Sequence, residues 1–378
     1  MTVRTSMLVL LGCWAAGCAS STEPVTEPTT EAPTATAPDT AAATAEPAAT
    51  QTPATSAPEV KVSLEDAAKK YVAESSAAWA AKDAKKQTAL YTPDAVVALP
   101  GPKGLEEAKA TDMEKGLASY FTAFPDLKLT YTRVVGKGNL AVAEWVFTGT
   151  NKGEHMGKPA TNKKVGYRGA SVLTFAPDGR VKHETVYFDM GTMMGQLGLG
   201  PKGAPVRPVE ATPTAAPELM FAKDGESPNE AVARSWFSTS EKGDAKALMA
   251  LASDDIVVSN QYMPADTKGK KALEKETAEG SKAFTDQKTS VVVCVPAGDL
   301  VACEYSWQAT WKGPAMGMKP TGKTGNVHSL EVLRVKDGKV AQTTAYANGV
   351  EFASSFGLMD EKPAGAPPAK GPAPKKSP

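Results

Sequence analysis

An internal duplication constrains this fold more than any other feature, because residues 63–200 and 227–360 carry the same order of sequence signals. Each copy opens with an apolar stripe at helical spacing behind a capping residue, Ser63 in the first and Ser227 in the second. A second helical stripe and then alternating apolar residues follow in both copies. A repeat this long exceeds the roughly 20–50 residues of a solenoid unit. The sequence therefore predicts two tandem domains of one fold.

Turn signals at matching places predict the order of strands within each copy. The hairpin signals are Gly138-Asn139 and Pro177-Asp178-Gly179 in the first copy, and Gly298-Asp299 and Lys336-Asp337-Gly338 in the second. Each copy is thus predicted as helix, short strand, helix and then an antiparallel meander of about four strands. We predict the α+β class, with two tandem domains in which a curved antiparallel sheet wraps over N-terminal helices.

Three other segments have the composition of linkers. Residues 19–62 are mostly Thr, Pro, Ala and Glu, and they contain too few large apolar side chains to offset the entropy lost on ordering. Residues 201–226 are rich in Pro and Ala, and residues 361–378 are rich in Pro and Lys. We expect a disordered stalk, an interdomain linker and a disordered tail.

The first 18 residues are typical of a secretory signal. A short apolar run at 7–11 is followed by Ala15-Ala16-Gly17-Cys18, which resembles a bacterial lipobox, in which the cysteine becomes lipidated after cleavage. The alternative is an ordinary signal peptide cut at a small residue. We expect Cys18 to anchor the protein to a bacterial membrane, facing the periplasm or the exterior. Ala19, where Asp would retain a lipoprotein in the inner membrane, favours the outer membrane.

Charge and composition exclude several functions. Lys+Arg and Asp+Glu both number 42, so no excess positive charge is available to bind nucleic acid. With three histidines, four cysteines and neither a CxxC nor an HExxH motif, the sequence contains no recognisable metal site. We expect neither a nucleic-acid partner nor a bound metal.

Motifs of the first copy resemble a known family. They are Thr148-Gly149-Thr150, Gly153-Glu154-His155-Met156-Gly157, Pro159-Ala160-Thr161, Asp178-Gly179-Arg180-Val181, Asp189 and Gln196-Leu197-Gly198. Together they resemble the SnoaL-like polyketide cyclases, also called ester cyclases, of the nuclear transport factor 2-like superfamily. The second copy resembles this family only in its predicted fold. The resemblance implies cone-shaped domains with an apolar cavity, and aldol ring closure by an aspartate without metal or cofactor.

Asp189 matches the acidic position of that family, which makes it the candidate catalytic residue. A carboxyl group in an apolar cavity can move a proton near neutral pH, because desolvation raises its pKa. His183, Thr185, Tyr187 and Asp189 alternate along one strand and should share a face, with Tyr187 beside Asp189. The alternative role for Asp189 is that of N-cap for a helix at 192–194.

Four further residues of the first copy are candidate ligand contacts, namely Tyr187, His183, Trp145 and His155. His183 stands where the family usually has glutamate, and His155 where an aromatic residue is common. The alternatives are a core or cavity-wall position for Trp145 and an exposed loop position for His155.

The second copy lacks the candidate acid. When Tyr346 is aligned with Tyr187, Asn348 stands opposite Asp189. An amide does not exchange a proton near neutral pH, so we predict a degenerate second domain without catalysis. Cys294 and Cys303 flank a hairpin turn and form either a cross-strand disulfide or two small core positions.

Three functions remain open after this reading. The first is cofactor-free acid/base catalysis on a small apolar carbonyl substrate in the first domain. The second is a non-catalytic envelope protein that binds an apolar ligand or a protein partner through its two cups. The third is a structural pair in which the copies pack sheet to sheet as a pseudo-dimer. A cavity lined by Asp189 and Tyr187 favours the first two, and a filled cavity the third.

Overall fold

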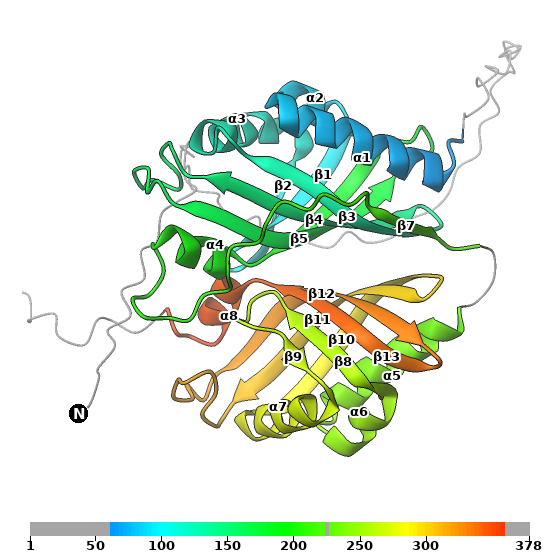
Figure 1. Cartoon of the computed structure of the whole chain (residues 1–378), viewed down its shortest axis with the longest axis vertical. Coiled ribbons are helices and arrows are strands. Elements are labelled where there is room, and N and C mark those ends of the chain that lie inside the picture. Colours follow the sequence, from blue (N-terminus) through cyan, green and yellow to red (C-terminus); the bar gives the residue numbers. More distant parts are fainter. Residues whose placement is uncertain (1–60, 224–226, 360–378) are drawn as a thin grey trace, which may run out of the picture.

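The structure is a computed structural model that describes residues 61–223 and 227–359. The signal segment, Cys18, most of the stalk and the tail lie outside the described residues. Two α+β domains are stacked with their sheets facing each other and their main helices on the two outer sides (Figure 1). The predicted fold class is confirmed, with two tandem domains that each carry helices on one face of a sheet.

The first domain has a seven-stranded sheet in the order β2-β1-β6-β5-β4-β3-β7, whose last strand, β7 (Glu218–Phe221), comes from the segment between the domains. Strands β1 and β6 are parallel, and the meander from β3 to β6 is antiparallel. Its elements are α1 (Leu64–Ala81), α2 (Ala84–Thr88), β1 (Tyr91–Gly101), β2 (Gly104–Lys109), the 3-10 helix η1 (Ala110–Asp112), α3 (Met113–Ala123), β3 (Lys128–Lys137), β4 (Leu140–Thr150), β5 (Lys164–Phe175), β6 (Val181–Phe188) and α4 (Met190–Leu197).

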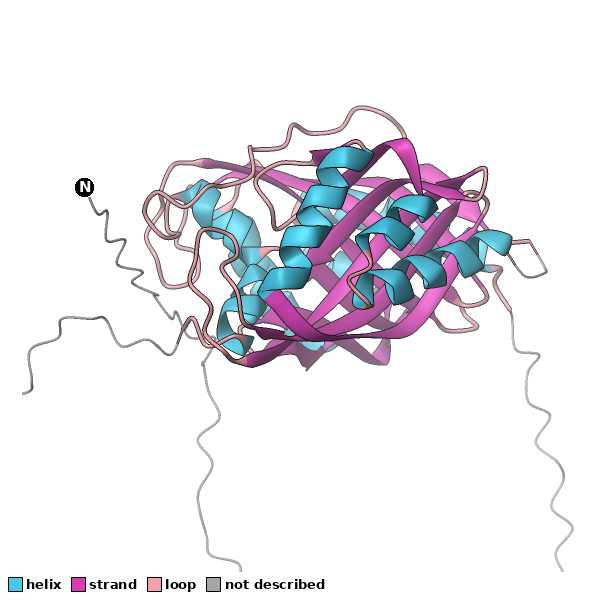
Figure 2. Ribbon diagram, turned by 90° about the horizontal axis from the view of Figure 1, so that it is seen from below, coloured by secondary structure: helices cyan, strands magenta, loops and turns pink. Residues whose placement is uncertain are grey.

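The second domain repeats this plan in a six-stranded sheet of order β10-β11-β12-β13-β8-β9. Seen from below, its helices lie across the strands of the sheet (Figure 2). Its elements are α5 (Pro228–Glu241), α6 (Ala245–Leu251), β8 (Ala252–Asn260), β9 (Thr267–Lys268), α7 (Lys270–Ala283), β10 (Phe284–Ala297), β11 (Leu300–Trp311), β12 (Thr324–Lys336), β13 (Lys339–Ala347) and α8 (Gly349–Ser355).

Local signals place the element boundaries where the sequence indicated. The Ser63 hydroxyl accepts a hydrogen bond from the backbone N–H of Asp66 (3.1 Å) and so caps α1. Strand β3 ends at Lys137 and β4 begins at Leu140, so the hairpin turns at 138–139. Gly138 has φ +66°, a conformation that glycine adopts without strain.

The segment between the domains is more ordered than a solvated linker. Strand β7 (Glu218–Phe221) adds to the edge of the first sheet, parallel to β3. Phe221 packs closely over Gly136, where a Cβ atom would lie 2.6 Å from the Phe221 ring. Earlier in the same segment, Arg207 donates a hydrogen bond to Asp266 of the second domain (2.6 Å). Composition alone did not indicate these contacts, because they involve few residues.

Each domain has its own core between helices and sheet, and a third cluster joins the two sheets. This interface cluster contains Val135, Val142, Ala170, Val172, Tyr187, Val295, Ala297, Leu300, Ala302, Leu330, Val332 and Tyr346. The outer face of each sheet is therefore covered by the other domain. Cys294 and Cys303, directly paired between β10 and β11, are joined by a disulfide.

Candidate functional site

Strand β6 divides the predicted site between two faces of the sheet. Tyr187 belongs to the cluster between the two domains, whereas Val186 and Phe188 pack into the core beneath the helices. The predicted alternation is present, but the face that carries Tyr187 meets the second domain rather than the interior of the cup. Both faces of β6 bear apolar residues, so alternation alone cannot identify the inner one.

Asp189 lies at the contact between α4 and α8, two helices that meet at the domain boundary (Figure 1). It is only 5% exposed. Its carboxylate accepts hydrogen bonds from the N–H groups of Gly191 (3.0 Å) and Thr192 (2.7 Å) and from the Thr192 hydroxyl (2.7 Å). A fourth comes from the N–H of Gly349, the first residue of α8 (2.8 Å). Burial raises the pKa of Asp189, and these hydrogen bonds act against that rise.

Four donors therefore occupy the oxygens of Asp189, and three of them are backbone N–H groups, two from the first turn of α4 and one from the first turn of α8. Helix N-termini carry partial positive charge, which favours a carboxylate there. Asp189 is the N-cap of α4 and also accepts a hydrogen bond from the start of α8. This arrangement leaves the carboxylate committed to structure instead of open to a substrate.

Asn348 is the counterpart of Asp189 and also spans the domain boundary. Its Oδ1 accepts a hydrogen bond from the N–H of Val350 (3.1 Å) and caps α8, while its Nδ2 donates to the carbonyl of Gly101 in the first domain (3.0 Å). The Asp-to-Asn difference between the copies therefore changes the hydrogen bonds between the domains, and neither side chain lies in the core beneath the helices.

Two tyrosine–glutamate hydrogen bonds also cross the domain boundary, one from each domain. Tyr187 donates a hydrogen bond to Glu304 (2.7 Å), and Tyr346 of the second domain donates to Glu144 of the first (2.6 Å). The pairs sit at corresponding places, since both tyrosines are on the last strand of their domain. The two copies thus meet like the halves of an isologous dimer.

The two glutamates of these pairs differ in the residue that lies opposite them on the neighbouring strand. Arg133 lies opposite Glu144 on the paired strand and its Nη1 is 2.9 Å from the carboxylate, whereas Val293 lies opposite Glu304. On the second side, Nδ1 of His328 lies 2.7 Å from Oε1 of Glu351. The hydrogen bond with Glu351 raises the pKa of His328, with a smaller contribution from the charge of Glu304.

The His328–Glu351 pair predicts that the stability of the protein depends on pH. The pKa of His328 is higher in the folded protein than the unperturbed value of about 6.5. Protonated His328 therefore contributes fully to the free energy of unfolding below about pH 6.5, and this contribution is lost as the pH rises through the folded pKa. We expect the urea midpoint of unfolding to fall over that interval. The variant His328→Gln should show a flatter pH profile, and an equal slope in both proteins would contradict the assignment.

The remaining predicted contacts of the first domain pack in its core. Trp145 is buried and donates a hydrogen bond from Nε1 to the Ser171 hydroxyl (3.2 Å), so it forms part of the cup wall. His155 lies edge-on to Tyr120 and Phe124, with ring centroids 4.9 and 5.1 Å away, instead of standing exposed in its loop. Burial lowers the pKa of His155 to about 4, so its ring is neutral.

His183 does not join Asp189. It is a partly buried residue of β6, paired in register with Val96 of β1. The carboxylate inside the cup belongs to the next residue, Glu184.

Glu184 is the centre of a buried polar cluster between the sheet and helix α1. Its side chain is 5% exposed and accepts a hydrogen bond from the Tyr91 hydroxyl. The Tyr91 hydroxyl lies 3.4 Å from that of Tyr71 and 3.5 Å from the amide nitrogen of Gln87. Burial raises the pKa of Glu184, while hydrogen bonds from Ser171 and Tyr91 partly oppose this effect. The sequence signal was the one acidic residue of β6, in the same alternating register as Val186 and Phe188.

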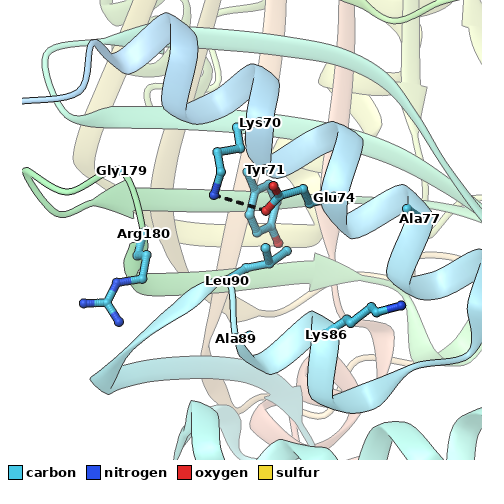
Figure 3. Close-up of a pocket in the computed structure, with 9 residues that line it drawn as sticks. All are labelled: Lys70, Tyr71, Glu74, Ala77, Lys86, Ala89, Leu90, Gly179 and Arg180. Carbon is cyan, nitrogen blue, oxygen red and sulfur yellow. Dashed lines mark ion pairs between the residues drawn. The ribbon is translucent and has the colours of Figure 1, made fainter.

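A pocket of about 320 Å³ opens beside this cluster, between α1, α2 and the β5–β6 turn (Figure 3). Its charged lining includes the ion pair of Lys70 and Glu74 (3.2 Å), and its apolar lining includes Ala77, Ala89 and Leu90. Tyr71 also lines the pocket, and its hydroxyl lies next to that of Tyr91, which donates to Glu184.

Within residues 61–223 and 227–359, no group of three or more His, Cys, Asp or Glu side chains is arranged to hold a metal ion. In the same ranges, no helix is both long and apolar enough to cross a membrane.

Comparison with known proteins gives the family. The family model described as SnoaL-like polyketide cyclase matches residues 70–197 and again residues 230–354. The chain belongs to this family. Because the match occurs twice and covers most of both domains, the predicted tandem arrangement is confirmed for this SnoaL-family protein.

Solved structures similar to this SnoaL-family protein each cover about one domain. AclR from Streptomyces galilaeus is 26% identical, covers 36% of this chain and 85% of its own, and has a TM-score of 0.32. IdmH from Streptomyces antibioticus is 21% identical, covers 35% and 99%, and has a TM-score of 0.31. TsrD from Streptomyces laurentii is 15% identical, covers 36% and 98%, and has a TM-score of 0.32. A search of curated proteins found no match.

Proposed function

We propose that this protein is a lipid-anchored protein of the bacterial cell envelope whose first cup performs cofactor-free acid/base chemistry on a small apolar carbonyl compound. The observation that carries this proposal is the buried carboxyl group of Glu184 at the end of a hydroxyl chain that reaches a pocket. In this proposal Glu184 takes the role that the family resemblance gave to Asp189.

The chemistry needs one proton to move in each direction. A carboxylate can remove the proton α to a carbonyl, which leaves an enolate, and the protonated carboxyl group can return it. In the removal step, Tyr71 takes the α-proton as it gives its own proton to Tyr91, and Tyr91 gives its proton to the Glu184 carboxylate. The reverse relay, from protonated Glu184 through Tyr91 and Tyr71, returns one proton to the same carbon, so no net proton is gained or lost. Burial raises the pKa of Glu184, which favours its protonated form.

Exchange of α-protons tests this chemistry without knowledge of the natural substrate. We expect the protein to catalyse deuterium incorporation into 1-tetralone in D₂O, followed by proton NMR. Glu184→Gln should slow it by about 100-fold or more, as expected for loss of a general base. Asp189→Asn is the matched control, because its oxygens face helix N-termini, and it should retain exchange. Unchanged exchange in Glu184→Gln would refute the proposed role of Glu184.

The lipid anchor has a separate basis and a separate test. Support comes from the Ala15-Ala16-Gly17-Cys18 sequence, followed by a Pro/Thr/Ala-rich segment suited to a tether. We expect bacteria that express the protein to incorporate labelled palmitate into it, and the variant Cys18→Ser to lose the label. Label retained in Cys18→Ser would contradict an anchor at this residue.

One observation favours another candidate function, the structural pair in which the two copies pack sheet to sheet. The interior of the first cup is filled by its own aromatic side chains, including Tyr131, Phe147 and Tyr167. In that case 1-tetralone neither binds at the pocket nor exchanges its α-protons. Absence of both binding and exchange in the wild-type protein would select this function.

A further inference from the structure

Two hairpin loops carry a strong excess of positive charge. They join β4 to β5 (residues 151–163) and β11 to β12 (residues 312–323). Together they contain six lysines, no arginine and a single acidic residue, Glu154, although the net charge of the whole chain is zero. The lysines are Lys152, Lys158, Lys163, Lys312, Lys319 and Lys323. We call these two loops the lysine-rich end.

The two loops lie at the same end of the molecule, on the left in Figure 1. Each is fixed at its start to the helix that precedes the meander. The N–H of Lys152 donates to the carbonyl of Ala123, the last residue of α3, and the N–H of Lys312 donates to that of Ala283, the last residue of α7 (both 2.8 Å). Helices α4 and α8, which meet at the domain boundary, lie at this end as well. The positive charges of the two loops therefore add on one side of a protein that is neutral overall.

Each loop contains a two-residue turn whose first residue is methionine. Met156 and Met316 both have φ +51°, and the glycines that follow them, Gly157 and Gly317, have φ +69° and +71°. The residues on either side of each turn pair as an antiparallel bridge. Turns of this kind favour asparagine at the first position, because a residue such as methionine rarely adopts a positive φ. The methionine is therefore unfavourable for the turn itself in both domains, which indicates a role outside the fold.

The second loop presents its methionine to solvent. Met316 is 48% exposed, whereas Met156 is half-buried and packs on the core of the first domain. A Cβ atom built on Gly317 would meet no atom within 4 Å, so the tip of this loop stands clear of the rest of the described chain. Lys312 and Lys319, on either side of Met316, are exposed and form no ion pair with a described residue. The second loop therefore places one apolar side chain between two cations.

We propose that the lysine-rich end docks on a membrane surface that contains anionic phospholipids. The lysines lie against the lipid phosphate groups, and Met316 inserts at the boundary between headgroups and acyl chains. Lysine suits such a surface because it acts as a point charge, whereas recognition of nucleic acids or phosphopeptides favours the fixed fork of arginine. The exposed apolar residue among the charges favours lipid over a purely polar acidic partner.

Docking at this end turns the pocket of the first domain away from the lipid. Arg180 lines that pocket and follows the end of β5 that is remote from the β4–β5 loop. The 12 residues of β5 separate its two ends by about 40 Å. The chain enters α1 at the pocket end too, since the N–H of Val62 donates to the carbonyl of Pro177 (3.0 Å). Residues 19–62 can span this distance from the proposed anchor at Cys18, because a proline-rich chain extends by about 3 Å per residue.

Vesicle sedimentation tests the docking. The full-length Cys18→Ser protein is used, so that no acyl chain attached at this residue contributes. We expect it to bind mixed phosphatidylglycerol–phosphatidylcholine vesicles more tightly than phosphatidylcholine vesicles, and high salt to weaken that binding. In this background, Lys312→Gln with Lys319→Gln should weaken binding about 30-fold, since each lysine near an anionic surface contributes about 5-fold. The matched control is Lys336→Gln with Lys339→Gln, two exposed lysines of the β12–β13 turn at the far end of β12, which should bind as before.

A substitution at the tip separates insertion from charge. Asparagine fits a positive φ, so Met316→Asn keeps the turn, and it should weaken vesicle binding about 10-fold without lowering the melting temperature. Unchanged vesicle binding in Met316→Asn would refute the insertion of this side chain. Equal binding by the two double-lysine variants, or no preference for phosphatidylglycerol, would overturn the proposal. Binding to duplex DNA without binding to the vesicles would also overturn it, because the lysine-rich end would then serve a nucleic acid.

Discussion

Replacing Asp189 with alanine is expected to destabilise the protein by about 3 kcal/mol. The substitution removes four hydrogen bonds at once, and it leaves the first turn of α4 and the N–H group of Gly349 in α8 without their acceptor. Loss of one N-cap typically costs about 1 kcal/mol, and a buried hydrogen bond to a charged group contributes about 1.5–3 kcal/mol. Urea unfolding followed by circular dichroism measures the change.

Asn348→Ala is the matched control for that prediction. It also removes a helix cap at the domain boundary, but the lost groups carry no charge, and one of their three hydrogen bonds is a long one to the Met190 sulfur (3.9 Å). We expect a loss of about 1–2 kcal/mol, smaller than that for Asp189→Ala. A stable Asp189→Ala protein that has lost 1-tetralone exchange would show instead that Asp189 is catalytic.

Replacing Leu330 with alanine should cost about 3 kcal/mol and loosen the contact between the domains. Leu330 has no exposed surface and lies in the cluster between the two sheets. Its truncation removes apolar contacts and leaves a cavity that flat sheets close poorly. Hydrogen exchange should therefore increase in the facing strands β4 and β5 as well as in β12 itself.

A second leucine provides the comparison for Leu330. Leu219 of β7 is 37% exposed, and Leu219→Ala should change stability by no more than about 0.5 kcal/mol. If Leu330→Ala changed stability as little, or increased exchange only in the second domain, the sheet-to-sheet packing would be contradicted.

Much of the fold could be predicted from sequence periodicity. The two copies, their helix starts and the turns at Gly138 and Gly298 depend on local patterns, and the structure has them at those places. Strand β7 was missed because four residues between prolines and polar residues give too little periodicity. Its order depends on the edge of β3, a contact distant in sequence.

The candidate site was predicted only in part, for a geometrical reason. Alternation along β6 predicted one face for His183, Tyr187 and Asp189, but both faces of this strand are covered, one by helices and the other by the second domain. A sequence does not show which apolar face meets which partner. Asp189 was therefore predicted as the catalytic acid of the first domain. Glu184, which lies on the opposite face of β6 from Tyr187, faces the helices instead.

Carboxyl-carbon NMR of Glu184 tests the central claim most directly, since that claim is that Glu184 is the proton-carrying group of the first cup. The pKa of Glu184 should lie above the value of about 4.3 for an exposed glutamate, and its signal should shift when 1-tetralone is added. Tyr91→Phe should raise that pKa further, because it removes a hydrogen bond to the carboxylate. An ordinary glutamate pKa, unmoved by Tyr91→Phe and by 1-tetralone, would contradict the claim.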